Sequence, residues 1–403
     1  MRFTDTSSLG SLPDVWHSQE ATTPTLETDV SKDAGDLLVS TLSSITVDHK
    51  NLRDVARAIV KATGSDDAEA TIVADHLVEA NLRGHDSHGV GMLPLYVQNF
   101  HAGKLKPNQH ARMLREDGAI AVFSGEMGYG QKIAREVTDW AIGRARTNGV
   151  AIVALRDVQH IARVGSYGEQ AAEAGMIAIL FVNALSGHPF VAAFGGSDGR
   201  FSTNPICIAI PGKDPETPLV LDFATSTVAM GKVRVAYNSG KHVAPGLLID
   251  EHGRPTTDPG VLWPDRSKGA ILPFGLHKGF GLAVVAELLG GALTGNLTYQ
   301  PENDRDVGIK NGMFAIVFAP ERLGDLNAFQ QEMQAFLDYV KASPPADPNA
   351  PVLIAGEPER NTRKKRMAEG IPIDGKTWAD IRSAADSLGL GARTVEEIAH
   401  GRN

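Results

Sequence analysis

Apolar positions in the first part of the chain recur every three or four residues, which is the spacing of one face of a helix. In 67–83, for example, this spacing places Ala70 and Leu77 on the same face. The stretch Ser65-Asp66-Asp67 at its start offers a cap for the first turn, and Gly84 can end the helix. We therefore expect helices at 50–63, 67–83 and about 90–100.

Residues 1–45 show little periodicity and are rich in Ser, Thr, Asp and Pro. Such a segment buries too little apolar surface to fold by itself, so we predict a mobile N-terminal arm. The alternative is a short docking helix that uses Leu37, Leu38 and Leu42.

From about residue 119 onward, short apolar runs alternate with stretches of helical spacing. The run at 150–155 lies between two such stretches, at 131–147 and 166–174. This alternation is the βαβ pattern, which predicts a parallel or mixed sheet covered by helices. We expect strands at 119–123, 150–155, 176–182, 206–210, 218–222 and 313–318. We expect further helices at 226–236, 277–293 and 325–341, and a polar loop at 238–273.

The composition is that of an ordinary globular protein, with 42% apolar and 22% charged residues among 403. A formal charge of −9 argues against a nucleic-acid-binding protein, which needs a basic surface. Cys207 is the one cysteine, so an intramolecular disulfide and a cysteine-rich zinc module are excluded. No apolar run reaches the roughly 20 residues of a membrane span, and the opening residues do not resemble a signal peptide. We therefore expect a cytoplasmic protein that binds neither nucleic acid nor membrane.

The common nucleotide-binding fingerprints are missing from the sequence. The turn at 125–130 reads G-x-x-G-x-G, which has the wrong spacing for the Rossmann motif G-x-G-x-x-G. Gly231-Lys232 only superficially resembles the end of the phosphate loop G-x-x-x-x-G-K-[ST]. The basic stretch 360–366 suggests nucleic acid, but it interrupts an acidic chain. We expect a solvated face or a subunit contact there.

Ionisable side chains gather in the segment 83–89, which reads R-G-H-D-S-H-G between two predicted helices. Ser87 and His88 fall where the predicted helix at about 90–100 begins. Free backbone amides at a helix start favour an anion such as a carboxylate or a phosphate. The alternatives are a plain helix cap with solvated histidines, or a zinc site that uses His85 and His88. Because no second carboxylate–His element has a recognisable spacing, we expect no metal.

His160 and Arg163 follow the apolar run 150–155. Functional groups of α/β folds gather at the carboxyl ends of such strands. His160 can take or give a proton near neutral pH, and Arg163 can hold a carboxylate with a bidentate fork. This pair is what the reduction of a 2-oxo acid requires, although a histidine bonded to the backbone is a common structural alternative.

Three further polar segments lie next to predicted strands or helices. Asp222 ends the strand at 218–222 and can cap the next helix or orient a histidine. Lys278 and Gly279 open an apolar helix, where a lysine can neutralise a phosphate and a glycine permits close approach of a ligand. The third segment is 201–205. Taken alone, each is more often structural than functional.

Taken together and in this order, the segments resemble the malate/L-lactate dehydrogenase family, a non-Rossmann group of NAD(P)-dependent 2-oxo acid and ketimine reductases. The resembling segments lie at 82–97, 154–176, 202–206, 221–234, 255–260, 276–292 and 355–361. Each segment is a weak indication alone. In register, they span most of residues 48–375 and indicate the family specifically.

The resemblance implies a fold and an assembly. The α/β fold combines a non-Rossmann dinucleotide-binding domain, with a mixed sheet, and a helical domain built from the N- and C-terminal segments. We place the arm at 1–45, the N-terminal helical segment at 46–118, the central domain at 119–320 and the C-terminal helical segment at 321–403. A homodimer whose active site can take residues from both subunits is also implied.

The resemblance also implies roles for individual residues. The predicted catalytic residues are His160, Ser87, His88 and Asp222. His160 would donate the proton to the carbonyl or imine that is reduced, and Arg163 and Arg83 are the predicted substrate ligands. The predicted contacts to NAD or NADP are Asn183, Thr203, Asn204, Pro205, Asp222, Phe223, Ala224, Lys278, Gly279, Gly356 and Glu357.

The sequence departs from the family pattern at one informative place. Many members have an arginine suited to the substrate carboxylate where this chain has Met92, and a small or aromatic residue where it has Arg163. We therefore hypothesise that Arg163 takes over carboxylate binding. This weakens the case for malate and leaves room for bulkier or aromatic 2-oxo acids. The alternatives are a reductase of cyclic ketimines and a catalytically inactive dinucleotide-binding protein.

Overall fold

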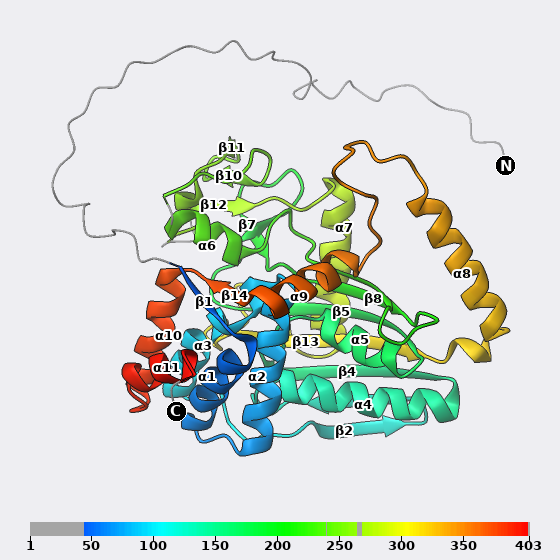
Figure 1. Cartoon of the computed structure of the whole chain (residues 1–403), viewed down its shortest axis with the longest axis horizontal. Coiled ribbons are helices and arrows are strands. Elements are labelled where there is room, and N and C mark those ends of the chain that lie inside the picture. Colours follow the sequence, from blue (N-terminus) through cyan, green and yellow to red (C-terminus); the bar gives the residue numbers. More distant parts are fainter. Residues whose placement is uncertain (1–43, 239, 264–267, 402–403) are drawn as a thin grey trace, which may run out of the picture. The chain divides into compact units, whose positions relative to one another are not determined.

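The computed structural model describes residues 44–238, 240–263 and 268–401. Figure 1 shows the helices and strands of this part of the chain. The predicted arm at 1–45 lies outside the described residues, apart from its last two. No helix within these ranges is long and apolar enough to cross a membrane.

The first helices pack against helices from the other end of the sequence (Figure 1). The elements that share this buried apolar cluster include α1 (His49–Ala62), α2 (Asp67–Leu82), α3 (Leu93–His101), α10 (Gly375–Ser387) and α11 (Ala392–Ala399). Two short strands, β1 (Ile45–Val47) and β14 (Ile371–Ile373), pair antiparallel and fasten the two ends together. Asp66 caps α2 by accepting a hydrogen bond from the backbone N–H of Glu69. A helical domain built from both ends of the chain is therefore confirmed.

A mixed sheet forms the centre of the fold. Across the described residues its order is β2 (Arg112–Asp117), β3 (Ile120–Ser124), β4 (Val150–Gln159), β13 (Lys310–Phe318), β5 (Ile177–Leu185), β8 (Ile206–Ile210) and β9 (Leu219–Phe223). Only β3 and β4 pair in parallel, and the other neighbours are antiparallel. β4 and β5, joined by α5 (Gly165–Glu173), run in the same direction with β13 inserted between them. The predicted mixed, helix-covered sheet is therefore confirmed.

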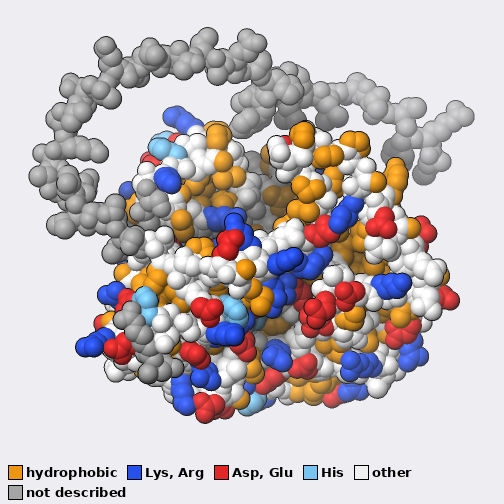
Figure 2. Space-filling view, viewed as in Figure 1, with side chains coloured by type: hydrophobic (Ala, Val, Ile, Leu, Met, Phe, Trp, Pro, Cys, Tyr) orange, Lys and Arg blue, Asp and Glu red, His pale blue; other side chains and the backbone are white. Residues whose placement is uncertain are grey.

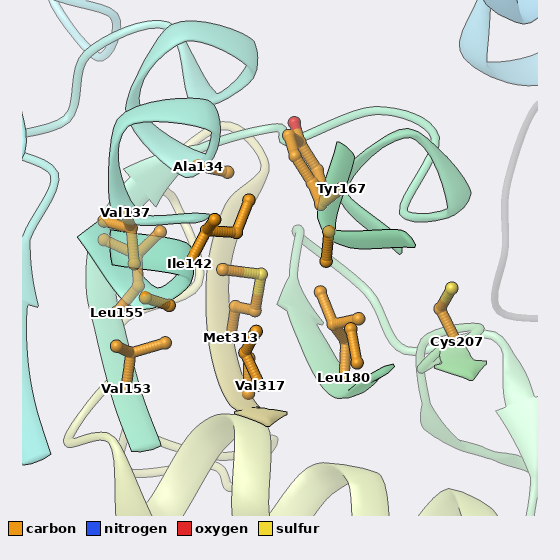
Figure 3. Close-up of a cluster of buried hydrophobic side chains, with 14 of the residues drawn as sticks. Ala134, Val137, Ile142, Val153, Leu155, Tyr167, Leu180, Cys207, Met313 and Val317 are labelled. Atoms are coloured by element: carbon orange, nitrogen blue, oxygen red, sulfur yellow. The ribbon is translucent and has the colours of Figure 1, made fainter. Parts of the chain in front are cut away.

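The core of the central domain lies between this sheet and its helices. In β4, Ala151, Val153 and Leu155 are buried and their neighbours are half-buried, because successive side chains point to opposite faces. Figure 3 shows the resulting layer, in which side chains of β4, β5 and β13 pack with those of α4 (Gly130–Asn148) and α5. The labelled members include Val137, Ile142, Val153, Leu155, Tyr167, Leu180, Met313 and Val317.

A second, smaller sheet contradicts one prediction. Its order is β11 (Pro255–Thr256), β10 (Leu248–Asp250), β12 (Gly269–Ile271), β6 (Val191–Ala192) and β7 (Gly199–Phe201). The prediction of a polar loop at 238–273 is wrong, because this segment contains β10, β11 and β12. These strands are too short to show an alternating pattern, and β12 finds its parallel partner β6 far upstream in the sequence.

α6 (Met230–Asn238) begins later than predicted. The backbone N–H of Thr225 donates to the carbonyl oxygen of Thr203, and that of Thr227 donates to Leu272. The threonine hydroxyls bond to the same two carbonyls. These bonds to remote carbonyls keep Thr225 and Thr227 out of the helix, so α6 begins only at Met230.

The remaining elements connect these layers. The predicted helix at about 90–100 begins as a 3-10 turn and becomes an α-helix only at Leu93, and the predicted helix at 277–293 finishes as a π-helical segment. The elements are η1 (Asp86–His88), η2 (Val90–Met92), η3 (Pro259–Val261), α7 (His277–Ala286), the π-helical η4 (Glu287–Leu293), η5 (Pro320–Arg322), α8 (Leu326–Lys341) and α9 (Glu357–Glu369). α8 agrees closely with the predicted helix at 325–341.

Candidate active site

The candidate site lies where strands of opposite direction meet at one edge of the central sheet. β4, β5 and β9 end at this edge, while β8 and β13 begin there, because antiparallel neighbours start where their partners finish. His160 directly follows β4, and Asp222 lies near the end of β9. The topology therefore brings together the segments 157–165, 201–205 and 221–226, which are separate in the sequence.

Two adjoining cavities open at this edge, with volumes of about 780 Å³ and about 160 Å³. Of the predicted site residues, the larger cavity is lined by Arg83, Ser87, His88, Arg163, Thr203, Pro205, Asp222, Phe223 and Ala224. The smaller cavity is lined by Ser87, His88, His160, Thr203 and Pro205. The structure thus gathers residues that the sequence predicted from four separate segments.

The turn that carries Ser87 and His88 is held by side chains on both sides. Asn81 accepts a hydrogen bond from the backbone N–H of Val90 at 2.8 Å, and its amide nitrogen donates to Asp86 at 2.7 Å. Arg366 of α9 pairs with the same Asp86 carboxylate at 2.6 Å.

Figure 2 shows Lys and Arg side chains gathered over α9. In that helix Arg363 also pairs with Glu79 of α2 at 2.6 Å. The basic stretch 360–366 therefore contributes contacts within this chain, in addition to any solvated face. By tying α9 to the end of α2 and to η1, these arginines fix the segment that lines both cavities.

His160 is held by neighbours that the sequence did not reveal. Its Nδ1 lies 2.8 Å from the hydroxyl oxygen of Tyr96, and Gln131 donates its Nε2–H to that oxygen at 2.7 Å. The ring of His88 stacks near His160, with centroids 5.5 Å apart and planes at 25°. Ser87 Oγ lies 3.0 Å from His88 Nδ1, so a row of polar groups runs from Ser87 to Gln131.

Both histidines of this row are neutral near pH 7. Desolvation, followed by the neighbouring His88 and His76, lowers the pKa of His160 well below its usual range. Desolvation also lowers the pKa of His88 to about 4. Among the described residues, none hydrogen-bonds to Nε2 of His160, which belongs to a ring lining the smaller cavity. A neutral imidazole in this position can accept a proton from a ligand.

Arg163 is buried, and its guanidinium is engaged by carboxylates of the same chain. Its Nη1 and Nη2 donate to the two carboxylate oxygens of Glu169 at 2.8 and 2.9 Å. Its Nε lies 3.9 Å from Asp222, which in turn accepts from the backbone N–H of Gly165 at 2.7 Å. Desolvation alone would lower the pKa of Arg163, but Glu169 and Asp222 outweigh it and raise that pKa.

The position of Arg163 bears on the hypothesis that it binds a substrate carboxylate. Its fork already holds Glu169, which also pairs with Arg83 at 3.1 Å. Desolvation raises the pKa of Asp222, and the positive charge of Arg163 opposes that rise. To meet a substrate, Arg163 would have to release Glu169 inside the protein. The structure therefore points to a supporting role for Arg163, as a buried part of the wall of the larger cavity.

Six predicted cofactor residues lie outside the lining of both cavities. They are Asn183, Asn204, Lys278, Gly279, Gly356 and Glu357. Asn183 accepts from the side chain of Asn296 at 3.0 Å, and Asn204 donates to Glu287 at 2.7 Å, so both hold interior loops. The others lie at the starts of α7 and α9. Their contacts to a dinucleotide stay predictions.

Three residues at the site escaped the sequence analysis. Tyr96 has the spacing of a core residue of α3, and Gln131 lies in the first turn of α4, so nothing local links either to His160. Arg234 of α6 lines both cavities. It ends the resembling segment 221–234 and follows Gly231 at helical spacing, but neither feature marks it as a site residue.

Comparison with known proteins agrees with this geometry. The profile of the malate/L-lactate dehydrogenase family matches residues 47–382. Hydroxycarboxylate dehydrogenase B of Escherichia coli (strain K12) is 44% identical over 353 residues, covering 87% of this chain and 96% of that protein.

Two solved structures share the fold. Malate dehydrogenase of Pyrococcus horikoshii OT3 is 30% identical, with a TM-score of 0.75, and covers 86% of this chain and 96% of its own. The delta1-piperideine-2-carboxylate reductase of Pseudomonas syringae pvar. tomato is 27% identical, with a TM-score of 0.73, and covers 85% and 100%. The profile match includes every residue placed at the two cavities. By sequence and by fold, this chain belongs to the malate/L-lactate dehydrogenase family.

Proposed function

We propose that this protein is a nicotinamide-dependent dehydrogenase of 2-hydroxy acids, in which His160 exchanges the hydroxyl proton. The observation that carries the proposal is the neutral His160 ring, held by Tyr96 and lining a small cavity beside a large one. The relatives named hydroxycarboxylate and malate dehydrogenases support the same reaction class.

The larger cavity suits a dinucleotide, NAD or NADP. Its volume of about 780 Å³ lies within the roughly 300–1,000 Å³ typical of ligand and cofactor sites. Thr203, Asp222 and Phe223 line it, and the exposed Lys232 offers positive charge to phosphates. A bound nicotinamide would supply the hydride acceptor for C2 of a hydroxy acid, or the hydride donor for an oxo acid.

The proton has a defined route through His160. When a 2-hydroxy acid is oxidised, Nε2 accepts the hydroxyl proton while the C2–H bond breaks. The imidazolium that forms still carries a proton on Nδ1. This N–H donates a hydrogen bond to the hydroxyl oxygen of Tyr96. The amide oxygen of Gln131 is buried without a partner, and a half-turn of the amide brings it to Tyr96 as an acceptor. Tyr96 and Gln131 can therefore stabilise the charged ring.

A second candidate is the reduction of a cyclic imino acid. The delta1-piperideine-2-carboxylate reductase shares this fold with a TM-score of 0.73, which favours the candidate. The hydride chemistry is the same, and the protonated atom is the imine nitrogen in place of the carbonyl oxygen.

A substrate panel separates the two candidates. Pyruvate, oxaloacetate, phenylpyruvate and a cyclic ketimine are each tested with NADH and NADPH, and consumption of the reduced nicotinamide is followed by absorbance. We expect turnover of at least one 2-oxo acid and little turnover of the ketimine. Turnover of the ketimine alone would support the second candidate, and dinucleotide binding without any turnover would contradict both.

We also propose that the protein is a cytoplasmic homodimer. α8 buries none of its residues, and Phe336 and Tyr339 in it are 60% and 77% exposed. Figure 2 shows hydrophobic side chains exposed over α7 and α8. Large apolar groups in such number favour a second copy as the partner. The double variant Phe336→Asp, Tyr339→Asp should halve the molar mass measured by light scattering, and an unchanged mass would exclude α8 from the interface.

A further inference from the structure

The smaller cavity is apolar over most of its surface. It is lined by Met92, Leu95, Val182, Phe190, Met230 and Trp263, among others. No described residue in its lining is Asp, Glu or Lys, and Arg234 is the only one with a permanent charge. Its volume of about 160 Å³ is close to the roughly 150 Å³ of a cavity that holds a benzene ring. The cavity therefore suits a phenyl or branched alkyl group.

Arg234 reaches this cavity because α6 packs directly onto η1. A Cβ at Gly231 would lie only 2.7 Å from that of Ser87, so a glycine permits the close approach of the two elements. Arg234 follows one turn later on the same face of α6. One of its terminal nitrogens lies 3.7 Å from the place that a Cβ would take at Gly91 of η2. Its guanidinium thus lies between α6 and η2, where the two cavities adjoin.

Arg234 differs from the other arginines at the site in what it contacts. Arg83 donates to Glu79, and Arg163 donates to Glu169. No hydrogen bond or ion pair joins the Arg234 side chain to any other residue that the structure describes. A half-buried guanidinium offers five N–H donors in a planar fork, which match the two oxygens of a carboxylate. The free fork is therefore suited to the anionic group of a ligand.

We propose that Arg234 binds the substrate carboxylate and that the apolar walls of the smaller cavity hold the substrate side chain. The inference rests on the proposed dehydrogenase function, because His160 in the same lining must exchange a proton with the neighbouring C2 oxygen. The assigned substrates are 2-hydroxy and 2-oxo monocarboxylic acids with branched or aromatic side chains. A second carboxylate, as in malate, would lie against hydrocarbon without a cation, which is unfavourable.

The carboxylate contact is tested by comparing phenylpyruvate with its methyl ester in the full-length protein and in Arg234→Met. We expect the wild-type protein to prefer the acid, and the variant to lose roughly 30-fold or more in kcat/KM for the acid. The loss should lie mainly in KM, because the ion pair exists in the ground and transition states alike. The variant should no longer distinguish acid from ester, which a role in packing alone would not explain.

Matched controls make the comparison specific. Lys241→Met removes the same charge from an exposed residue that lines neither cavity, and should leave KM unchanged. Arg234→Lys keeps the charge without the fork and should give an intermediate KM. If Arg234→Met does not bind the dinucleotide normally, Arg234→Gln and Arg234→Lys carry the same acid-to-ester comparison.

The outcomes distinguish this inference from the proposed function. If the wild-type protein turns over 2-oxo acids but the Arg234 variants keep its KM and its preference for the acid, the inference is overturned and the function stands. A higher kcat/KM for oxaloacetate than for phenylpyruvate and 4-methyl-2-oxopentanoate would overturn the assigned substrate class. If no 2-oxo acid is turned over, the proposed function fails first.

Discussion

Two regions of the site each contribute an arginine, and the two arginines differ in the hydrogen bonds that they make with the rest of the chain. In the region formed by α5 and β9, Arg163 is buried and donates to both oxygens of Glu169 beside Asp222. In the region formed by α6 and η2, Arg234 is half-buried and has no acceptor among the described residues. The comparison teaches that, of two arginines in a cavity wall, the one suited to a ligand is the one whose terminal nitrogens have no acceptor within the described chain.

The difference has a physical basis. A buried ion pair is balanced within the protein, so removing either partner leaves an uncompensated charge. An arginine without a partner keeps its donors available, and desolvation of the surroundings strengthens its attraction for an anion. Arg163 should therefore matter chiefly for folding, and Arg234 chiefly for substrate affinity.

The largest expected effect is on stability. Arg163→Met should lower the free energy of unfolding by about 3–5 kcal/mol, because Glu169 and Asp222 would lose their buried cation. Urea denaturation measures the change, and Arg200→Met is the matched control. The side chain of Arg200 is 63% exposed in its pair with Asp198, so its loss should change stability by less than about 1 kcal/mol. An Arg163 variant that is equally stable but has a raised KM would restore the substrate role that the sequence suggested.

The next effect is on catalysis. His160→Gln should lower kcat by roughly 100-fold or more, because no other side chain exchanges the proton in the proposed reaction. Dinucleotide affinity, followed by fluorescence of the reduced nicotinamide, should stay within about twofold, since His160 lines only the smaller cavity. Near-normal turnover would show that His160 does not exchange the proton. The comparison of Arg163 with Arg234 would then lose its basis, because it assumes that the substrate binds beside His160.

A smaller effect is expected for the group that holds His160. Tyr96→Phe removes the acceptor of the Nδ1 proton and should lower kcat roughly tenfold, with little change in KM. It should also shift the pH profile, which a packing change alone would not do. Tyr129→Phe is the control, because the Tyr129 hydroxyl contacts Thr63 and its ring packs beside that of Tyr96. Equal losses in the two variants would indicate a packing effect.

The smallest effect concerns pH. Oxidation requires neutral His160, and desolvation lowers the pKa of that ring below its usual range. The neutral form therefore persists as the pH falls, so kcat/KM for a 2-hydroxy acid should stay nearly constant from pH 8 to 6.5 and decline only in more acidic buffer. An unperturbed histidine would already be half protonated near pH 6.5. If kcat/KM reached half of its plateau at pH 6.5 or above, the pKa of His160 would not be lowered. That result would contradict the desolvation of the ring that the structure indicates.

Much of the architecture was predictable because its patterns are local. The helical spacing in 67–83 and the apolar run at 150–155 correspond to α2 and β4 within a few residues. The strands of the smaller sheet were not predictable, since two or three residues carry no period and β12 pairs with the distant β6. The late start of α6 likewise depends on bonds from Thr225 and Thr227 to remote carbonyls.

In the candidate site, too, the features with a local pattern were predictable and those that depend on distant segments were not. The position of His160 after a strand and the cluster at Ser87-His88 were visible in the sequence, and the structure brings them to one cavity. The support from Tyr96 and Gln131 was not visible, because hydrogen bonds between distant segments leave no local pattern. The predicted domain boundaries, and the dinucleotide contacts of residues such as Lys278 and Gly356, stay predictions.

By itself, the sequence determined the alternation of helices and strands, the family resemblance and the side chains able to move a proton. Only the tertiary structure decided which of two arginines is already paired and which one faces a cavity without an acceptor. The physical reason is that apolar periodicity is repeated within one segment, whereas the partner of a charged group is chosen by contacts between segments far apart in the chain.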